Sequence, residues 1–407
     1  PPPRGPDRAP GLRDPRVGVA AIRTARAGLA SEAGTGPASG RILDCLEAAL
    51  LLPWDAALAL EAATLEDLAQ TPEAAALCHL GRAERRVLPP HAPPAPRLAR
   101  LGVMGAAGAP LAGLAADAGL AVTLVEADPA RLKAALAEIA RHAETAVAAG
   151  RLLPAARDAA WARLTPAMDT AALAGCDLVL LAPGADLAAA AASTSSGTVL
   201  ALLGRGAGLA GARAADVVGF QPAPGRLIEV IATPATASHS LAVAQALAAR
   251  LSRLSVVWQA PGGVAALVMA TGRAAGAHLA SRIGAGPVAA ALGAAGLSML
   301  APDQHGPAGA ETLPAPQIVA RVLSAMANAA AGALAQGLAA SGAEIDLALV
   351  VGMGFPRLLG GPCHWADARG LMILRRDLTL WAAEDACLFA PAPLVSDRMS
   401  AGIGLSA

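Results

Sequence analysis

Aromatic side chains are scarce in this chain. Its 407 residues include three Phe, five Trp and no Tyr, together 2% of the sequence. Few rings are therefore present for stacking on the bases of a single-stranded nucleic acid. Neither sign of charge dominates, because 31 Lys and Arg balance 31 Asp and Glu. Without a net field, we expect neither nucleic acid nor an acidic membrane surface as a partner.

Cysteine is sparse and follows no pattern. The five cysteines are scattered, and no two form a C-x-x-C pair. An odd, unspaced set argues against a disulfide scaffold and a zinc site. It indicates reduced thiols and predicts a cytoplasmic location. The seven histidines have no Cys or carboxylate at metal-binding spacing, so we expect no metal site.

Long, strongly apolar runs are lacking as well. The longest charge-free stretches, such as Leu187–Gly204 and Gly284–Pro302, are rich in Ala, Gly and Ser and too weakly apolar to cross a bilayer. The first ten residues, PPPRGPDRAP, contain no apolar core of the signal-peptide type. We therefore expect no membrane segment.

One stretch, residues 98–132, has the order of a dinucleotide-binding βαβ unit. An apolar run at Leu101–Met104 leads through a Gly/Ala turn into a helical pattern at Leu111–Leu120. A second run, Ala121–Val125, ends in Glu126, which lies 21 residues after Gly105. An acid at that distance binds the ribose hydroxyls in such units. The predicted cofactor-binding residues are Gly105, Ala107, Gly108 and Glu126.

The glycine fingerprint of this unit is altered. Its G-x-G-x-x-G frame, started at Gly105, has Ala107 at the second position and Pro110 at the third. The Ala107 methyl group occupies space where phosphate would approach, and Pro110 removes an N–H from the anion-binding helix end. Two readings stay open: intact NAD binding, for which Glu126 would disfavour a 2′-phosphate, or a Rossmann-like unit that keeps its shape without its ligand.

The surrounding sequence predicts an α/β fold followed by an all-α region. Strand patterns alternate with helical ones over residues 97–260, which indicates a Rossmann-type doubly wound sheet. The rest is mostly helical, and two of its segments have weakly similar sequences. We therefore expect two related helical modules, a shortened one at 261–313 and a second at 314–407. In the N-terminal part, we predict that residues 1–38 are mostly disordered and that residues 39–96 form a helical segment with a Pro-rich connector.

Three stretches together resemble the multifunctional fatty-acid β-oxidation enzymes, in which an enoyl-CoA hydratase is fused to a 3-hydroxyacyl-CoA dehydrogenase. Residues 42–85 are similar to the helical tail of the hydratase domain. The Rossmann unit and GFQPAPGRLIEVIATPATA (219–237) are similar to the dehydrogenase, and IDLALVVGMGFPRLLGGPCHWADARGL (345–371) is similar to its closing helical domain. The main body of a hydratase is not among these stretches, so we expect no hydratase chemistry.

The resemblance implies NAD-dependent oxidation of a (3S)-3-hydroxyacyl-CoA. In this family a histidine takes the hydroxyl proton, a carboxylate orients the imidazole, and a serine and an asparagine complete the site. The resemblance also implies acyl-CoA as the ligand, and a homodimer or a complex with a thiolase subunit. Glu229 matches the catalytic carboxylate.

The other catalytic positions of the family are not matched. The nearest polar residue at the histidine position is Gln221, whose amide does not titrate near neutrality and cannot act as the base. The serine position reads Leu203-Gly204-Arg205, and the asparagine position falls in Gly262–Leu267. We therefore predict impaired or lost activity. The alternatives are a rearranged working site, a non-catalytic scaffold or acyl-CoA/nucleotide-binding relative, and a decayed product.

Overall fold

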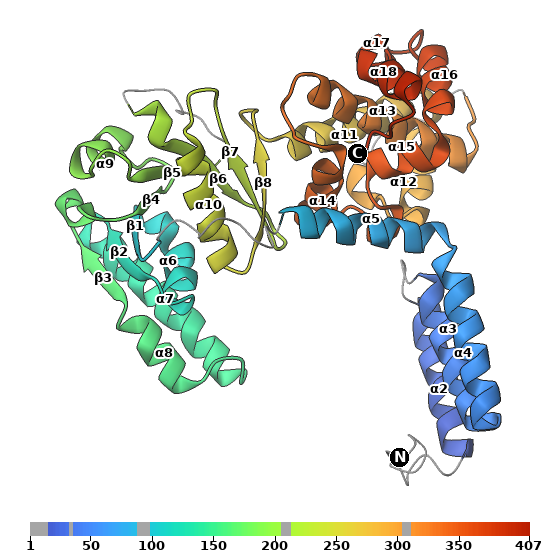
Figure 1. Ribbon diagram of the computed structural model, residues 1–407, viewed down its shortest axis with the longest axis horizontal. Helices are drawn as coiled ribbons and strands as arrows, with labels where there is room; N and C mark the ends of the chain where they lie inside the picture. The colour runs from blue at the N-terminus through green and yellow to red at the C-terminus, as the bar shows by residue number, and fades with distance from the viewer. Residues whose placement is uncertain (1–14, 32–35, 88–97, 205–212, 303–310) are drawn as a thin grey trace.

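The computed structural model describes residues 15–31, 36–87, 98–204, 213–302 and 311–407. Three parts are visible in Figure 1: a sheet flanked by helices, a helical region coloured orange to red, and a group of N-terminal helices that projects from the helical region. The predicted fold class, a Rossmann-type α/β sheet followed by an all-α region, is confirmed.

The sheet has eight strands in the order β3-β2-β1-β4-β5-β6-β7-β8, and neighbours are parallel except for β6 and β7. The strands are β1 (Arg100–Met104), β2 (Ala121–Val125), β3 (Leu164–Ala167), β4 (Leu178–Leu181), β5 (Val199–Leu203), β6 (Val217–Pro222), β7 (Leu227–Ile231) and β8 (Leu254–Trp258). The first six follow the order of a dinucleotide-binding sheet. β4 is buried along its whole length, as expected for a central parallel strand.

β3 is a strand that the sequence did not predict. Its four residues, LTPA, are too short and too polar to give a strand pattern, and none is buried. It pairs in parallel with β2 at the edge of the sheet. Pro166 is tolerated there because an edge strand leaves one row of N–H groups without a ladder partner.

Helices cover both faces of the sheet. They are α6 (Ala109–Asp117), α7 (Pro129–Ala148), α8 (Pro154–Trp161), α9 (Leu187–Ser193) and α10 (Ser238–Arg250). Buried alanines of α6 pack with Leu and Val from β1 and β2 in one core cluster. The small side chains allow α6 to lie close to the strands, which sets the position of the turn between β1 and α6.

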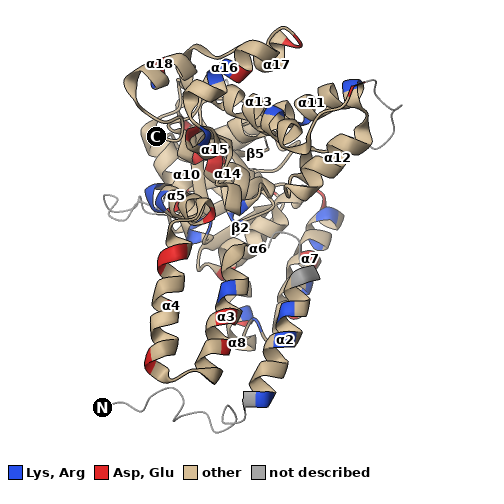
Figure 2. Ribbon diagram, turned by 90° about the vertical axis from the view of Figure 1, so that its right-hand side faces the viewer, with Lys and Arg blue, Asp and Glu red and all other residues tan. Residues whose placement is uncertain are grey.

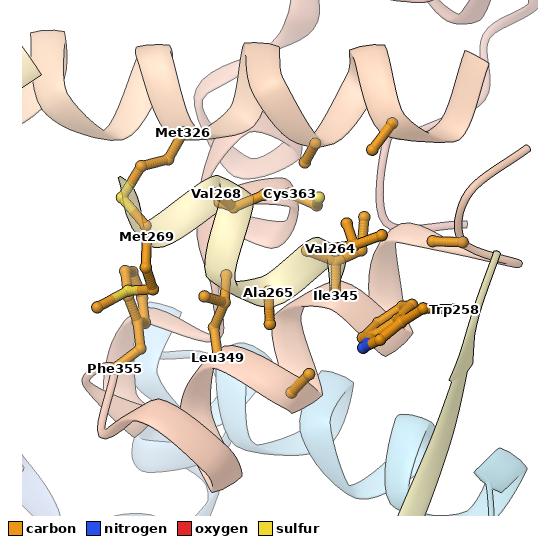
Figure 3. Close-up of a cluster of buried hydrophobic side chains, with 14 of the residues drawn as sticks. Trp258, Val264, Ala265, Val268, Met269, Met326, Ile345, Leu349, Phe355 and Cys363 are labelled. Carbon is orange, nitrogen blue, oxygen red and sulfur yellow. The ribbon is translucent and has the colours of Figure 1, made fainter. Parts of the chain in front are cut away.

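The helical region joins the sheet through β8. Its elements are α11 (Val264–Ile283), α12 (Ala285–Ala294), α13 (Ala315–Ala335), α14 (Gly342–Met353), α15 (Pro362–Arg369), α16 (Leu371–Trp381), α17 (Ala386–Phe389) and α18 (Pro393–Ala401). Figure 3 shows Trp258 of β8 beside Val264 and Ala265 of α11 and Ile345 of α14. The end of the sheet is therefore packed into the helical core. The predicted relation between two helical modules stays a prediction.

α13 has the length and mean hydropathy, 1.5, of a membrane-crossing helix. However, 72% of its most apolar window is buried inside the protein. Such burial is typical of the central helix of a helical domain, where the same composition serves the core.

The N-terminal helices are α2 (Pro15–Ser31), α3 (Pro37–Leu51), α4 (Trp54–Ala69) and α5 (Pro72–Val87). The prediction that 1–38 is mostly disordered is wrong for α2, whose amphipathic spacing brings Ile22 against α3. Residues 1–14 lie outside the described residues, and so does all but Val87 of the predicted Pro-rich connector, VLPPHAPPAP (87–96). Figure 2 shows basic residues along α2 and acidic ones on α4.

α5 attaches the N-terminal helices to the body of the protein. It contacts α14 and β8, and its His79 places Nε2 2.9 Å from Oδ2 of the buried Asp346. Asp346 also accepts hydrogen bonds from the backbone N–H groups of Cys363 and His364, at 2.9 Å each. One carboxylate thus ties α5, α14 and α15 together.

Candidate cofactor site and reaction centre

A cavity of about 310 Å³ opens where β1, β2 and β4 end. Its lining includes Met104, Gly105, Ala107, Glu126, Arg131, Ala182, Gly184 and Asp186. In open α/β sheets, ligands bind outside the carboxyl ends of parallel strands, where the chain reverses its strand order. This cavity therefore lies where a dinucleotide would bind, and the predicted residues Gly105, Ala107 and Glu126 all line it.

Gly105 makes the turn that follows β1. Its φ of +99° favours glycine, and a Cβ atom there would lie 2.9 Å from the Cβ of Ala182. Its N–H donates to the carbonyl of Val125 at 2.8 Å, which joins the end of β1 to the end of β2. A side chain at this position would disturb both the turn and its contact with the segment after β4.

Gly108 provides the close approach of helix and strand that the fingerprint requires. A Cβ atom on Gly108 would lie 2.4 Å from Cγ1 of Val103, so this position accepts no side chain without rearrangement. In the frame started at Gly105, Pro110 holds the third fingerprint position, where the helix would pack on the strand, but Pro110 is exposed and this expectation is wrong. The close contact lies two residues earlier because a short 3₁₀ turn, Ala106–Gly108, precedes α6.

Ala107 is exposed and forms part of the cavity wall. Its methyl group is therefore at the surface that a pyrophosphate would approach. Pro110 lies in the first turn of α6, a position where proline is well tolerated because the first N–H groups have no partner within the helix. The helix end keeps its dipole toward the cavity region.

Glu126 is 8% exposed and already has protein partners. Its Oε2 accepts from the N–H of Ala106 at 2.9 Å, and its Oε1 accepts from the N–H of Asp128 at 3.2 Å. Nη2 of Arg131 lies 3.3 Å from Oε2. The sequence indicated the acid but not its cation. The spacing of Arg131, in the first turn of the next helix, was the signal that could have revealed it.

These residues fit the adenosine and pyrophosphate part of NAD. The turn at Gly105 allows backbone to approach phosphate, the N-terminal end of α6 favours negative charge, and Glu126 can accept from ribose hydroxyls with its remaining lone pairs. Gly108 supports the site by packing against Val103 and not by contact with a ligand, since it is buried and does not line the cavity.

The predicted catalytic carboxylate has a different environment. Glu229 lies on β7 and is 4% exposed. Its Oε2 accepts a hydrogen bond of 2.6 Å from the indole N–H of Trp258, on the neighbouring strand β8. A Cβ atom on Gly263 would lie 2.4 Å from the same oxygen. Glu229 is thus held between the sheet and the start of α11.

Gln221 lies opposite Glu229 in the antiparallel pair of β6 and β7. Cross-strand partners share a face of the sheet and lie within contact range. The Gln221 side chain, however, donates through Nε2 to the carbonyl of Pro222 at 3.0 Å. The structure therefore brings the two predicted residues together, with a side chain that can donate and accept but cannot remove a proton.

The remaining family positions are apolar or outside the described residues. Gly262 and Gly263 both have positive φ, and the following Val264 and Ala265 are fully buried at the start of α11. At the serine position, Gly204 has a φ of +119°, while Arg205 lies outside the described residues. None of the described residues at these two positions carries a polar side chain.

The cofactor half of the sheet, around β1 and β2, has known counterparts. Residues 98–183 match the family described as 3-hydroxyacyl-CoA dehydrogenase, NAD binding domain. NAD is the cofactor of this type of domain. The matched segment contains β1 to β4, and so includes Gly105, Gly108 and Glu126.

Curated relatives match a segment of similar length. The glyoxysomal fatty acid beta-oxidation multifunctional protein MFP-a of Cucumis sativus is 36% identical over 95 residues, 23% of this chain and 13% of that protein. The peroxisomal multifunctional protein MFP2 of Arabidopsis thaliana is 36% identical over 80 residues, 20% of this chain and 11% of that protein. This chain therefore spans about an eighth of the length of these relatives.

Solved structures show the same fold over a larger part of the chain. The 3-hydroxybutyryl-CoA dehydrogenase of Escherichia coli aligns with a TM-score of 0.62 at 17% identity, covering 75% of this chain and 99% of that one. The dehydrogenase part of multifunctional enzyme 1 from C. elegans gives 0.50 at 13% identity, covering 79% and 96%. At these identities the likeness concerns the fold.

Proposed function

We propose that this chain is a 3-hydroxyacyl-CoA dehydrogenase relative that binds NAD(H) and whose oxidation of (3S)-3-hydroxyacyl-CoA is impaired or lost. The observation that carries the proposal is the pairing of Gln221 with Glu229 on β6 and β7. Oxidation requires a base to take the hydroxyl proton as hydride leaves for the nicotinamide. The amide of Gln221 cannot take that proton, and the carboxylate of Glu229 already accepts a hydrogen bond from Trp258.

The cofactor half supports the binding part of the proposal. The cavity, the turn at Gly105 and the acid Glu126 are present together, and the matched family is an NAD-binding domain. Fold and chemistry depend on different residues, so one can be kept while the other is lost.

The test combines binding with turnover. We expect saturable NADH binding in a fluorescence titration, weakened in Glu126→Ala and unchanged in the exposed α7 control Glu144→Ala. With (3S)-3-hydroxybutyryl-CoA and NAD, we expect a rate equal to buffer, and a measurable rate for Gln221→His. A wild-type kcat of about 1 s⁻¹ or more, as is common for enzymes, would contradict the loss of activity. Absence of NADH binding at millimolar concentration would contradict the binding.

A second candidate function is a non-catalytic scaffold. α4 favours it, because Leu58, Leu60 and Leu65 are exposed along a helix in which only Ala57 and Thr64 are buried. A helix of such composition is usually covered. If calorimetry detects binding of neither NADH nor an acyl-CoA, this interaction role is the one that remains.

Three further predictions form part of the proposal. Residues 42–85 correspond to a hydratase tail, the protein is cytoplasmic, and it forms a homodimer or binds a thiolase subunit. The sequence resemblance supports the first and third, and the unpatterned cysteines support the second. Light scattering, co-purification with a thiolase and cell fractionation test them. The two plant relatives described above are named as glyoxysomal and peroxisomal proteins, so fractionation tests that location as well.

A further inference from the structure

Arg131 lines the cofactor cavity but has no role in the proposed function. It lies in the first turn of α7, where Oδ1 of Asp128 caps the helix and accepts from the N–H groups of Ala130 and Arg131 at 2.8 and 3.3 Å. Its side chain is 62% exposed, lines the cavity and pairs with Glu126. A cation therefore lies beside the acid that receives the ribose hydroxyls of a dinucleotide.

We propose that Arg131 binds the 2′-phosphate of NADP(H), so that the cavity accepts this dinucleotide as well as NAD(H). The inference rests on the proposed cofactor binding and adds a ligand class to the same site. The phosphate would lie on the ribose, next to Glu126, within the space that Arg131 borders. A guanidinium matches two phosphate oxygens with a fork of N–H donors.

The charge of Glu126 does not exclude this ligand. A free carboxylate at the end of β2 would repel a 2′-phosphate, but two backbone N–H groups already donate to Glu126. These donors do not depend on the Arg131 side chain, because they belong to the turn after β1 and to the start of α7. The carboxylate charge is therefore partly offset without the arginine.

Arg131 can contact a phosphate without leaving Glu126. Its Nη2 lies 3.3 Å from Oε2 of Glu126, and the side chain is 62% exposed. A guanidinium has five N–H donors, so others remain for the phosphate oxygens. The other acid in the cavity lining, Asp186, accepts from the N–H groups of Ala188 and Ala189 at the start of α9. Its charge is directed to that helix end and leaves the ribose side to Arg131.

The experiment compares NADPH with NADH by fluorescence titration of the whole chain. Wild type should bind both. Arg131→Ala should weaken NADPH about tenfold or more, the loss of a charge-assisted hydrogen bond, and change NADH by about threefold or less. Arg141→Ala, which removes an exposed arginine of α7 that does not line the cavity, is the matched control and should change neither. Added salt should weaken NADPH more than NADH.

Three results would overturn the inference in different ways. If NADH binds and NADPH does not, or if Arg131→Ala weakens both equally, the 2′-phosphate contact is wrong and the proposed function stands. If neither dinucleotide binds, both the inference and the binding part of the proposed function are wrong.

Discussion

Two regions of one sheet differ in the groups that make their contacts. The cofactor half is the part around β1 and β2, and the reaction half is the part around β6 to β8. Around β1 and β2, the geometry depends on the absence of side chains at Gly105 and Gly108 and on backbone N–H groups. Around β6 to β8, the contacts are made by side chains: Glu229 accepts a hydrogen bond from Trp258, and Gln221 lies opposite Glu229. A substitution therefore changes the second region more directly than the first.

The largest expected effect tests whether the cofactor half depends on Gly108. Gly108→Val places a side chain against Val103, where Cβ alone would lie 2.4 Å from Cγ1. We expect the free energy of unfolding in urea to fall by about 3 kcal/mol, the upper range for overpacking. Gly286→Val in α12, where a Cβ meets nothing within 4 Å, should cost well under half as much. Equal losses would show that Gly108 has no special packing role.

The second effect tests whether Glu229 is now a structural residue. Glu229→Ala leaves the buried indole N–H of Trp258 without its acceptor, so we expect a loss of about 2 kcal/mol in the free energy of unfolding. Glu229→Gln keeps an acceptor oxygen and should lose less. If Glu229→Ala is as stable as wild type, the hydrogen bond between Glu229 and Trp258 does not stabilise the sheet, and the contrast between the two regions is smaller.

A third, smaller effect sharpens the comparison at the cofactor end. Ala107→Gly removes the methyl group from the cavity wall where pyrophosphate approaches. We expect NADH to bind more tightly by about 0.5–1 kcal/mol, roughly two- to fivefold, with turnover unchanged because the reaction half is untouched. A gain in turnover would mean that cofactor binding, and not the missing base, limits the chemistry.

The smallest effect concerns the contact between α15 and α5, through His364 and His79. Burial lowers the pKa of His364 from 6.5, and the charge of the neighbouring His79 lowers it further. The ring centroids of His364 and His79 lie 4.7 Å apart, and the rings stack. The unfolded chain therefore takes up a proton at His364 before the folded protein does. The stabilising contribution is complete above pH 6.5 and is lost as the pH falls toward the lowered pKa.

Thermal melts at pH 7.5 and 5.5 measure this contribution. Between pH 7.5 and pH 5.5, His364→Gln should lose less stability than wild type. This difference should be smaller than the losses expected for Gly108→Val and Glu229→Ala. Burial raises the pKa of Asp346, which has the opposite sign, since protonation then favours the folded state. Because Asp346 is present in both proteins, the difference between them isolates His364. Identical pH dependence would contradict the prediction.

Much of the fold could be predicted because it depends on local patterns. Buried runs such as CDLVLLA are apolar on both faces and appear as β4, and the acid-then-proline start of α7 is explicit in Asp128-Pro129. β3 could not be predicted in this way. Its four residues form a strand because β2 offers a free edge, which no property of LTPA encodes.

The sequence by itself determined the βαβ unit, the run of strands and the absence of a histidine at the family position before Glu229, since these follow from residue identity and period. Tertiary structure decided which glycine makes the close contact, which cation accompanies Glu126, and that Trp258 bonds to Glu229. Each of these depends on two segments meeting at a distance and angle that packing sets. Spacing along the chain can suggest a candidate such as Arg131, but it does not fix that distance and angle.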